Sequence, residues 1–388
     1  MSPTPLLILS DAPSALSGLG RITRELSQRI VANLSDKFRL ATLGYGGVGQ
    51  KDLPWQQYTM CGDPPARGWF VPELYLAWND FAGEEHGVVM TIWDASRMSW
   101  LTEPNACPDP VIRQWLSHRP FELWGYWPVD AEGVDHHLPH GFPDVMRKYN
   151  RNLAYSEWAR TLMKKDDIEA QALPHGIDTS IWYPRDRKLA RKKVQGLGMT
   201  RLGDNSLLVG VVATNQPRKD WALAFATCAE LLKQGQDVLV WCHTDTLRSH
   251  WDIVSLVQDF GLLNRVMVTH PPVNDEDMAQ LYSACDATLG IGLGEGWGFP
   301  LAESLACGTP VIHGNYGGGT DFIPKQLLVE PIAWRTEGQF NCVRPVFRAE
   351  DWAEKASTTK PEDAIVPGWI KWDNAWKEWS KWLLDGVK

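Results

Sequence analysis

Two glutamates, Glu295 and Glu303, lie eight positions apart in a glycine-rich stretch that runs into an apolar segment. The glycines let backbone N–H groups approach a ligand closely, and Pro300 suits the first turn of a helix. These glycines are Gly294, Gly296 and Gly298. Because Glu303 would fall one turn into that helix, both carboxylates can reach one ligand. Carboxylates only accept hydrogen bonds, so the pair suits the hydroxyls of a sugar or ribose; the alternative is a tight turn with two solvated acids.

A basic pair, Arg218 and Lys219, follows the apolar run at 206–214 and precedes a helical pattern that begins at Trp221. Arginine offers a planar fork of donors, lysine a point charge and the helix N-terminus its dipole, so the pair fits a diphosphate. A solvated surface pair is the alternative, because most charge pairs lie at the surface. The strand expected before the two glutamates belongs to the same half of the chain. We therefore expect the acids and the bases to line one ligand site.

The first apolar run of the chain is followed by a short glycine turn, Ser17-Gly18-Leu19-Gly20-Arg21. A G-x-G alone lacks the full dinucleotide-binding fingerprint, and no acidic partner stands at the expected distance. We interpret Gly18 and Gly20 as positions where the backbone approaches a ligand, with a plain helix-start turn as the equal alternative.

Two aspartates and a histidine in the first half are further candidates. Asp94 and Asp130 end two apolar runs, where either could face an acceptor hydroxyl or merely cap a turn. His175 precedes a charged segment and could reach the site, although a structural role is the default for a single histidine.

The elements that must position these residues alternate between short β-rich runs and helical patterns. This alternation favours βαβ units and parallel sheets, whose ligands bind at the carboxyl ends of the strands. We expect strands at 5–10, 39–44, 87–94, 121–130, 152–156, 206–214, 237–244, 265–271, 287–293 and 309–314. We expect helices at 21–32, 157–165, 221–233, 275–285 and 300–307.

The α/β pattern occurs twice, and residues 177–193 separate the two series. That segment has a charge cluster and no apolar period, so we predict a linker. The tail places apolar residues on one helical face, which predicts a terminal helix packed on a domain rather than a ligand-binding basket. These residues are Trp369, Trp372, Trp376, Trp379 and Leu383. The predicted parts are residues 1–180, residues 181–365 and a terminal helix within 366–388.

Composition excludes several classes of protein. The 388 residues suit two domains, and no apolar run approaches the roughly 18 residues of a membrane span. The start, MSPTPLLILSDAP, lacks the basic region and the long apolar run of a signal peptide. Seven cysteines without a C-x-x-C pair argue against a disulfide framework or a zinc site and favour a cytoplasmic protein. A net charge of −9 disfavours broad electrostatic binding of nucleic acid or anionic lipid.

The stretch GEGWGFPLAESLACGTPVI followed by GGGTDFI resembles the signature of retaining GT-B glycosyltransferases, in particular the family 4 type, glycosyl transferases group 1. Both glutamates, the glycines, the proline and C-G-T-P-V match in type and spacing. LPHGIDTSIWYP is similar to the family's segment at the domain junction, and Arg218-Lys219 is similar to its diphosphate-binding pair. The resemblance implies an α/β GT-B fold: two Rossmann-like domains whose parallel sheets face each other across a cleft, with a last helix that crosses back to the first domain.

The resemblance also implies roles for individual residues. Glu303 would bind the ribose, Glu295 the hydroxyls of the transferred sugar, and Arg218 with Lys219 the diphosphate. The loop from Thr269 to Val273 would lie near the base. The implied donor-binding set is Gly18, Gly20, Arg218, Lys219, Thr269, Val273, Glu295, Gly296, Trp297, Gly298, Phe299 and Glu303.

The implied reaction moves a hexose from a nucleoside diphosphate sugar, such as UDP-glucose or a GDP-hexose, to a hydroxyl with retention of configuration. Cations that would stabilise the leaving diphosphate are present, and the sequence has no obvious protein nucleophile or metal-binding D-x-D, so we expect neither metal nor cofactor. The family's usual histidine after a first-half strand is absent, since the comparable segments read TIWDAS and YWPVDA. Asp94 and Asp130 therefore join Arg218, Lys219 and Glu295 as catalytic candidates.

The sequence leaves alternatives open for the acceptor and for the class of activity. A soluble glycan, a small molecule or a hydroxymethylated base in DNA would each serve as acceptor. Nine of the 21 tryptophans lie among the first 180 residues, and with Arg67, Arg97 and Arg113 they could stack on and hold an extruded nucleotide. The alternative classes of protein are a sugar-nucleotide epimerase or phosphorylase of the same fold and a non-catalytic sugar-nucleotide-binding module.

Overall fold

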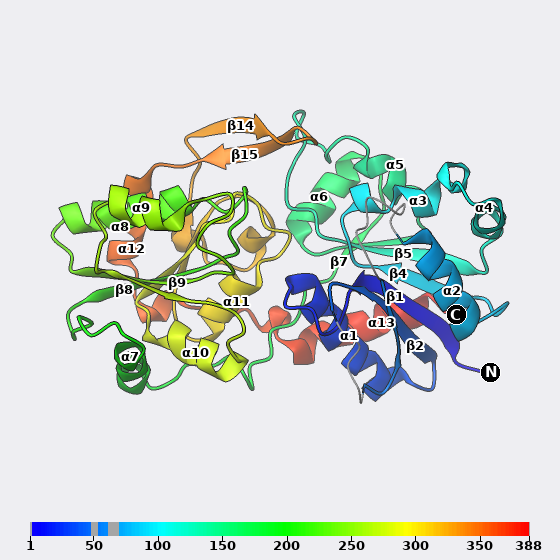
Figure 1. The fold of residues 1–388 in the computed structure, drawn as a ribbon, viewed down its shortest axis with the longest axis horizontal. Helices are drawn as coiled ribbons and strands as arrows, with labels where there is room; N and C mark the ends of the chain where they lie inside the picture. Colours follow the sequence, from blue (N-terminus) through cyan, green and yellow to red (C-terminus); the bar gives the residue numbers. More distant parts are fainter. Residues whose placement is uncertain (1, 48–52, 61–69, 388) are drawn as a thin grey trace. The chain divides into compact units, whose positions relative to one another are not determined.

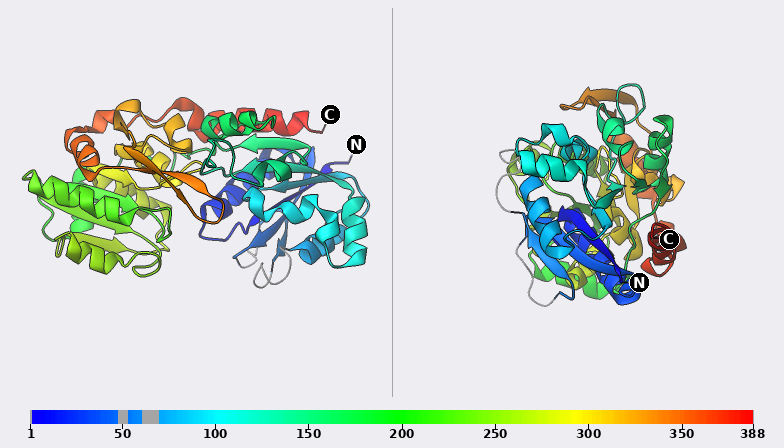
Figure 2. Two further views of the ribbon diagram at one scale, coloured as in Figure 1. Left: turned by 90° about the horizontal axis from the view of Figure 1, so that it is seen from above. Right: turned by 90° about the vertical axis from the view of Figure 1, so that its right-hand side faces the viewer.

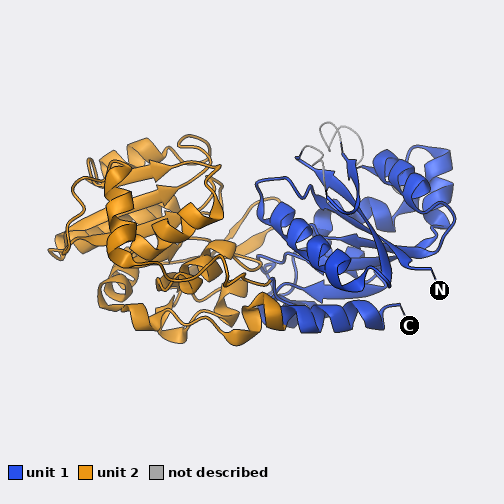
Figure 3. Ribbon diagram, turned by 90° about the horizontal axis from the view of Figure 1, so that it is seen from below, with its two compact units in different colours: residues 1–175, 375–388 blue, residues 176–374 orange. Residues whose placement is uncertain are grey.

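The computed structural model describes residues 2–47, 53–60 and 70–387. The chain forms two compact units (Figure 3). Unit 1 contains residues 1–175 and 375–388, and unit 2 contains residues 176–374. Arg67 and Trp69 lie outside the described residues. None of the described helices has the length and the apolar character needed to cross a membrane.

Unit 1 is built on a seven-stranded parallel sheet with the order β3-β2-β1-β4-β5-β6-β7. Its strands are β1 (Thr4–Asp11), β2 (Phe38–Tyr45), β3 (Gln56–Thr59), β4 (Gly87–Thr91), β5 (Phe121–Trp127), β6 (Arg151–Ala154) and β7 (Gln171–Ala172). β1 pairs with both β2 and β4, so the strand order changes direction there. In open parallel sheets, the loops at such a switch point form the ligand site.

Helices cover the unit 1 sheet, which explains why its central strands are continuously apolar. These helices are α1 (Gly18–Leu34), α2 (Val71–Phe81), α3 (Ser99–Thr102), α4 (Pro110–Ser117), α5 (Phe142–Met146) and α6 (Glu157–Lys165). Most described tryptophans of the first 180 residues belong to this core rather than to an exposed stacking surface. Trp55, Trp78, Trp93, Trp100, Trp124 and Trp127 are buried, and Trp115 and Trp158 are partly buried.

The C-terminal helix α13 (Trp372–Asp385) packs on unit 1, as predicted (Figure 1). Trp379 donates its indole N–H to the carbonyl of Pro174 at 3.0 Å, and the ring of Trp382 lies 5.0 Å from that of Trp124. The predicted stripe is partly wrong. Trp369 precedes the helix in a 3-10 turn and is 44% exposed, whereas Trp382, which the prediction omitted, is buried.

Unit 2 is built on a six-stranded parallel sheet with the order β10-β9-β8-β11-β12-β13. Its strands are β8 (Leu207–Val212), β9 (Val238–His243), β10 (Val266–Thr269), β11 (Ala287–Gly290), β12 (Val311–Gly314) and β13 (Leu328–Val329). Its helices are α7 (Arg187–Gly196), α8 (Trp221–Lys233), α9 (Ile253–Asp259), α10 (Asp275–Ala284), α11 (Phe299–Ala306) and α12 (Ala349–Thr358). Figure 1 shows α8, α9 and α12 on one face of the sheet and α7 and α10 on the other.

The predicted linker at 177–193 contains most of a helix, α7, so this prediction was wrong in its second half. Its charge cluster is a set of ion pairs rather than a solvated tether. Arg187 and Arg191 both pair with Asp286, and Lys193 pairs with Asp277 at the start of α10. Because ion pairs as well as apolar contacts hold this helix, a search for an apolar period missed it.

A two-stranded antiparallel hairpin, β14 (Ala333–Glu337) and β15 (Cys342–Val346), lies outside the parallel sheet of unit 2 and was not predicted (Figure 2). A two-stranded ribbon alone is marginally stable in water, so it needs anchors. Tyr316 donates its hydroxyl to the carbonyl of Val343 at 2.6 Å and packs its ring 5.4 Å from that of Trp334. The hairpin is thereby fixed to the loop that follows β12.

Candidate functional site

The carboxyl end of the unit 2 sheet brings Arg218, Lys219 and Glu295 together. Lys219 Nζ donates to Glu295 Oε1, and Arg218 Nη1 lies 3.5 Å from Glu295 Oε2. Backbone hydrogen bonds join the two loops that carry these residues. Leu293 N donates to the carbonyl of Arg218 at 2.9 Å, and Lys219 forms a β-bridge with Gly292. Glu295, one of the two predicted acids, is thus in contact with both predicted bases.

The Glu295 carboxylate is held in its ionised form. Its side chain is 14% exposed and that of Lys219 is 11% exposed, so burial alone would raise the pKa of Glu295. The positive charges of Lys219 and Arg218 and the Lys219 hydrogen bond outweigh this effect and lower the pKa to about 2. The cluster therefore carries two cations and one anion at neutral pH.

Two glycines make room for this cluster. A Cβ on Gly292 would collide with the carboxylate of Glu295. Gly298 has a φ of 96°, a left-handed conformation that glycine adopts without strain, and it precedes α11 as its N-cap. Pro300 occupies the first turn of α11, as predicted, so its missing N–H costs no hydrogen bond.

The remaining residues of the glutamate stretch are more buried. Glu303 is 6% exposed and accepts a hydrogen bond from the Tyr282 hydroxyl at 2.9 Å. Trp297 is 2% exposed and packs its ring 4.6 Å from that of Phe322, so its side chain belongs to the core. At Trp297, as at Gly296 and Phe299, the backbone is the part suited to meet a ligand.

His313, at the end of β12, is a buried neighbour of the cluster that the sequence analysis missed. Its Nδ1 lies 2.6 Å from the carbonyl of Gly290, and because a carbonyl only accepts, Nδ1 carries the proton. Burial lowers the pKa of His313, although the Gly290 carbonyl and the Glu295 charge oppose this. His313 is therefore neutral, and it lies close enough to Glu295 for the two groups to affect each other's pKa. Only its position near the end of an apolar run could have indicated it, and the other candidates share that kind of position.

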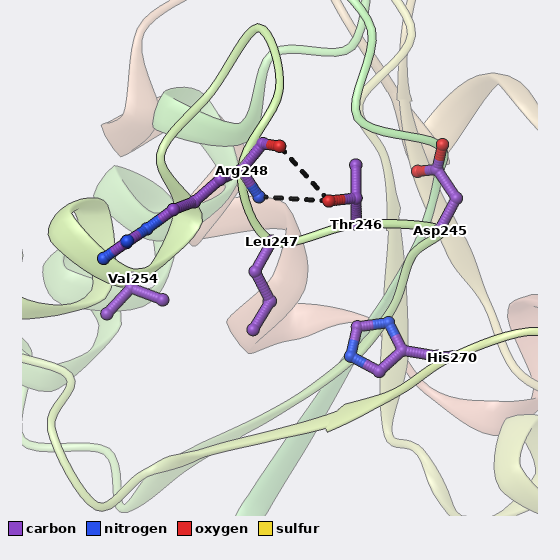
Figure 4. Close-up of a pocket in the computed structure, with 6 residues that line it drawn as sticks. All are labelled: Asp245, Thr246, Leu247, Arg248, Val254 and His270. Atoms are coloured by element: carbon purple, nitrogen blue, oxygen red, sulfur yellow. Dashed lines mark hydrogen bonds between the residues drawn. The ribbon is translucent and has the colours of Figure 1, made fainter.

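A pocket of about 500 Å³ lies at the ends of β9 and β10, next to Thr269 (Figure 4). Its lining residues are Asp245, Thr246, Leu247, Arg248, Val254 and His270. His270 Nδ1 donates to the carbonyl of Thr244 at 2.8 Å, which fixes the ring at the wall. The Thr269 hydroxyl is 2.9 Å from both Trp241 Nε1 and His243 Nδ1, so it points into the sheet edge rather than away from it. Val273, four residues later, is partly exposed.

The glycine turn of unit 1 starts helix α1. Ser17 caps the helix by accepting from Gly20 N at 3.0 Å. A Cβ on Gly20 would lie 2.7 Å from the carbonyl oxygens of Ala12 and Ala15, so close packing of the turn already requires this glycine. Gly18 is exposed at the first position of the helix.

Asp11, at the end of β1, is a second residue that the sequence analysis missed. Ser17 Oγ donates to Asp11 Oδ2 at 2.5 Å and Trp93 Nε1 donates to Oδ1 at 3.2 Å. Burial raises the pKa of Asp11, and these hydrogen bonds with the charge of Arg97 offset only part of the shift. Its position at the end of the first apolar run is the same signal that singled out Asp94 and Asp130.

The other first-half candidates occupy different positions. Asp94 lies in the loop after β4, 3.8 Å from Arg97, and Asp130 lies partly buried after β5. His175 is 2% exposed, with Nδ1 2.6 Å from the Tyr126 hydroxyl and its ring 4.2 Å from that of Tyr155. Burial, and then the charge of Arg21, lower its pKa well below the usual value. His175 is therefore a neutral core residue, in line with its default interpretation.

Across residues 2–47, 53–60 and 70–387, no three histidine, cysteine, aspartate or glutamate side chains are grouped closely enough to hold a metal ion.

Comparison with known proteins places the unit 2 cluster in a family. The model of the family "Glycosyl transferases group 1" matches residues 202–327, which include the basic pair and both glutamates. This segment is similar to the group 1 glycosyltransferases. The chain is also 27% identical over 215 residues to a D-inositol 3-phosphate glycosyltransferase of Actinosynnema mirum, an alignment that covers 53% of this chain and 46% of the relative. It spans about half the length of the curated relatives it matches.

Solved structures confirm the GT-B fold expected of a group 1 glycosyltransferase. Sucrose-phosphate synthase from Thermosynechococcus elongatus matches with a TM-score of 0.69 at 15% identity, over 98% of both chains. HepE from Anabaena, solved in complex with UDP and glucose, matches with a TM-score of 0.71 at 15% identity, over 98% of this chain and 100% of HepE. The two parallel sheets and the C-terminal helix agree with this fold.

Proposed function

We propose that this protein transfers a hexose from a nucleoside diphosphate sugar to an acceptor hydroxyl, with retention of configuration at the anomeric carbon. The observation that carries the proposal is the contact of Arg218 and Lys219 with Glu295 in the loop between β11 and α11, inside the segment that matches the group 1 family. Two cations beside a helix N-terminus suit a diphosphate, and an ionised carboxylate beside them suits sugar hydroxyls.

The donor diphosphate would compete with Glu295 for the two cations. Arg218 and Lys219 would donate hydrogen bonds to the phosphate oxygens as well as to Glu295. They would thereby stabilise the negative charge that develops on the diphosphate as the glycosidic bond breaks. Glu295, with a pKa lowered to about 2, would stay ionised and accept from the hexose hydroxyls. In this scheme the departing diphosphate takes the acceptor's proton, and Glu295 positions the sugar.

The rest of the donor would follow the same sheet edge. Glu303, fixed by Tyr282, would accept from a ribose hydroxyl, and the backbone N–H groups of Gly298 and Phe299 would reach sugar or phosphate. The base would lie near Thr269 to Val273, beside the pocket lined by His270. UDP is the first donor nucleotide to test, because the similar HepE structure contains UDP and glucose.

The acceptor would bind to residues at the carboxyl end of the unit 1 sheet. Asp11, Asp94 and Asp130 are the acidic candidates there, and Gly18 is an exposed backbone position beside them. A hydroxymethylated DNA base stays a prediction, and the relatives named above are not described as acting on DNA. D-inositol 3-phosphate, named in the description of the relatives, is the first acceptor to test.

A donor screen followed by product analysis tests the proposal. UDP-, GDP- and ADP-hexoses are compared by thermal shift, and the stabilising donor is incubated with acceptor panels that include D-inositol 3-phosphate, oligosaccharides and hydroxymethylated DNA. Mass spectrometry detects the glycosylated product, and NMR of the first product reports its anomeric configuration. We expect one donor class, a transferred hexose and retention; inversion or transfer of the phosphate would contradict the proposal.

Variants connect the activity to the cluster. Replacing both Arg218 and Lys219 with alanine should lower transfer by about 1,000-fold, and Glu295→Ala by about 100-fold, since each removes charged contacts to the transition state. Lys233→Ala is the matched control, because Lys233 ends the helix that follows the basic pair and is 74% exposed. If transfer were unchanged in the Arg218/Lys219 double variant and in Glu295→Ala, the site assignment would be wrong. Conversion of the donor sugar without any acceptor would favour an epimerase, and binding without turnover a binding module.

A further inference from the structure

We propose that His313 is a positioning residue of the donor site, whose imidazole ring fixes the place of Glu295 beside Lys219 and Arg218. This role rests on the proposed function, because the place of Glu295 matters for transfer only if Glu295 holds the donor sugar. His313 lies near the end of β12, and its side chain is fully buried. It therefore acts through its neighbours and not on the donor itself.

The backbone of Glu295 is held by the three-glycine turn that follows β12. Gly318 N donates to the carbonyl of Glu295 at 2.7 Å. Gly317 has a φ of 85°, in the left-handed region, and a Cβ there would lie 3.0 Å from both the nitrogen and the oxygen of Glu295. The turn and the Glu295 loop thus pack backbone against backbone. The position of Glu295 consequently depends on the position of this turn.

The His313 ring lies between the same turn and the end of β11. On one side, Nδ1 donates to the carbonyl of Gly290 at 2.6 Å, and Gly290 is the partner of His313 in the β11–β12 pairing. On the other side, a Cβ on Gly319 would lie 3.0 Å from Cδ2 of the ring. Such a distance is shorter than an ordinary van der Waals contact, so the ring fills the available room. The ring thereby sets the distance between the strand that leads into the Glu295 loop and the turn that holds the Glu295 backbone.

Both the shape and the hydrogen bond of histidine contribute to this arrangement. Leu301 of α11 is 3% exposed, and a Cβ on either Gly290 or Gly319 would collide with it, so Leu301 packs beside the ring. The Nδ1 hydrogen bond fixes the orientation of the ring within this close packing. Burial lowers the pKa of His313, so the ring is neutral at neutral pH and adds no positive charge beside Glu295.

A thermodynamic cycle tests the coupling without any assay of transfer. Urea unfolding at pH 7 measures the stability lost through Glu295→Gln, first in the wild type and then in the His313→Ala protein. Removal of the ring should loosen the contact of Glu295 with its two cations, so the second loss should be less than half of the first. Ile312→Ala is the matched control, because Ile312 is also fully buried and, as the preceding residue of β12, faces the other side of the sheet. This control should leave the Glu295→Gln loss unchanged.

Kinetics with the donor and acceptor that the screen selects give a second readout. His313→Ala should lower kcat at least about 10-fold and change the KM of the donor less than about threefold, because a misplaced group costs mainly in the transition state. His313→Asn should restore most of kcat, since its side-chain amide can donate to Gly290 from nearly the position of Nδ1. His313→Leu fills a similar volume without a donor and should not. If all three variants lowered stability but left kcat unchanged, His313 would be only a core residue and the proposal would be wrong.

The inference and the proposed function fail separately in these experiments. If the wild type transfers sugar but the Glu295→Gln losses in the wild type and in His313→Ala are equal, the role of His313 is wrong and the proposed function stands. If the wild type transfers no sugar from any donor, the proposed function is wrong, and the urea cycle alone decides whether His313 positions Glu295. If His313→Ala does not fold, Gly319→Ala replaces it in both tests, because its Cβ would press on the same ring.

Discussion

Each unit of this protein places a carboxylate at the carboxyl end of its parallel sheet, and the two carboxylates have opposite surroundings. Glu295 of unit 2 contacts Lys219 and Arg218, and the two cations lower its pKa to about 2 against the effect of burial. Asp11 of unit 1 accepts from a serine hydroxyl and an indole N–H, and burial raises its pKa. The same topological position therefore holds an ionic cluster in one unit and a network of mostly neutral donors in the other.

This difference corresponds to the two ligands of the proposed reaction. A nucleoside diphosphate sugar brings negative charge, so its site needs cations that can exchange one anion for another. An acceptor hydroxyl is neutral, so a carboxylate near it needs neutral donors that hold its orientation. The sequence alone would not separate the two cases, because both carboxylates simply stand at or beyond the end of an apolar run.

The largest expected effect is the pH-dependent stability that Glu295 contributes. Its pKa falls from 4.5 to about 2 on folding, so the contribution is present above pH 4.5 and is lost as the pH falls toward 2. This shift corresponds to about 3 kcal/mol. Glu295→Gln should therefore lower the free energy of unfolding, measured with urea, by about 3 kcal/mol at pH 7 and by much less near pH 3. Glu350→Gln, at an exposed position of α12, is the control. A loss that is equal at both pH values would show that the cluster is not ionic.

Asp11→Asn should have a smaller effect with the opposite dependence on pH. The folded pKa of Asp11 lies above 3.8, so the ionised side chain costs stability as the pH rises through the folded value. The variant, which cannot ionise and keeps one acceptor oxygen, should gain stability relative to the wild type between pH 3 and pH 7. The same urea series measures it. If the variant instead lost stability relative to the wild type with rising pH, a cation would have to lie closer to Asp11 than the structure shows.

The sequence predicted the residues of unit 2 better than those of unit 1, for physical reasons. Arg218, Lys219 and Glu295 differ in charge from the apolar strands before them, so their convergence at one sheet edge followed from strand pattern alone. Asp11 was overlooked because one of its two donors, Trp93, comes from the loop after β4, and only the fold brings it to Asp11 beside Ser17.

Long-range contacts also explain the elements that were missed. Helix α7 depends on ion pairs with residues nearly a hundred positions away, such as Arg187 with Asp286. The β14–β15 hairpin depends on its anchor at Tyr316. Neither leaves an apolar period in its own segment. The strands and helices that were predicted lie close to the observed ones, and α6 and α8 match residue for residue. The prediction did not include β3, β7, β13, α2, α3, α4, α5, α9 and α12.

Ser17→Ala should cost unit 1 about 1 kcal/mol of stability, the usual effect of losing an N-cap side chain. Ser17 accepts from Gly20 N and donates to Asp11, so the variant opens helix α1 and removes a hydrogen bond that lowers the pKa of Asp11. The loss of stability should therefore grow with rising pH, unlike that of an ordinary cap. Ser156→Ala, which removes the cap of α6, is the matched control and should lose the same amount at every pH. If the stability losses of the two variants depended on pH in the same way, Ser17 would have no effect on the pKa of Asp11.

The smallest expected effect concerns Arg97, a cation of unit 1. It lies 3.8 Å from Asp94 with both side chains 42% exposed, and its guanidinium lies 5.6 Å from the ring centre of Trp93. Exposed ion pairs and exposed cation–π contacts each contribute at most about 1 kcal/mol. Arg97→Gln should therefore lower the free energy of unfolding by less than about 1 kcal/mol, and added salt should reduce the difference further. Lys219→Gln, which leaves Glu295 buried beside Arg218 alone, should cost several times more and respond less to salt. If the two losses were equal, unit 1 would hold an ionic cluster of the same kind as unit 2, and the division between a charged donor site and a neutral acceptor site would have to be abandoned.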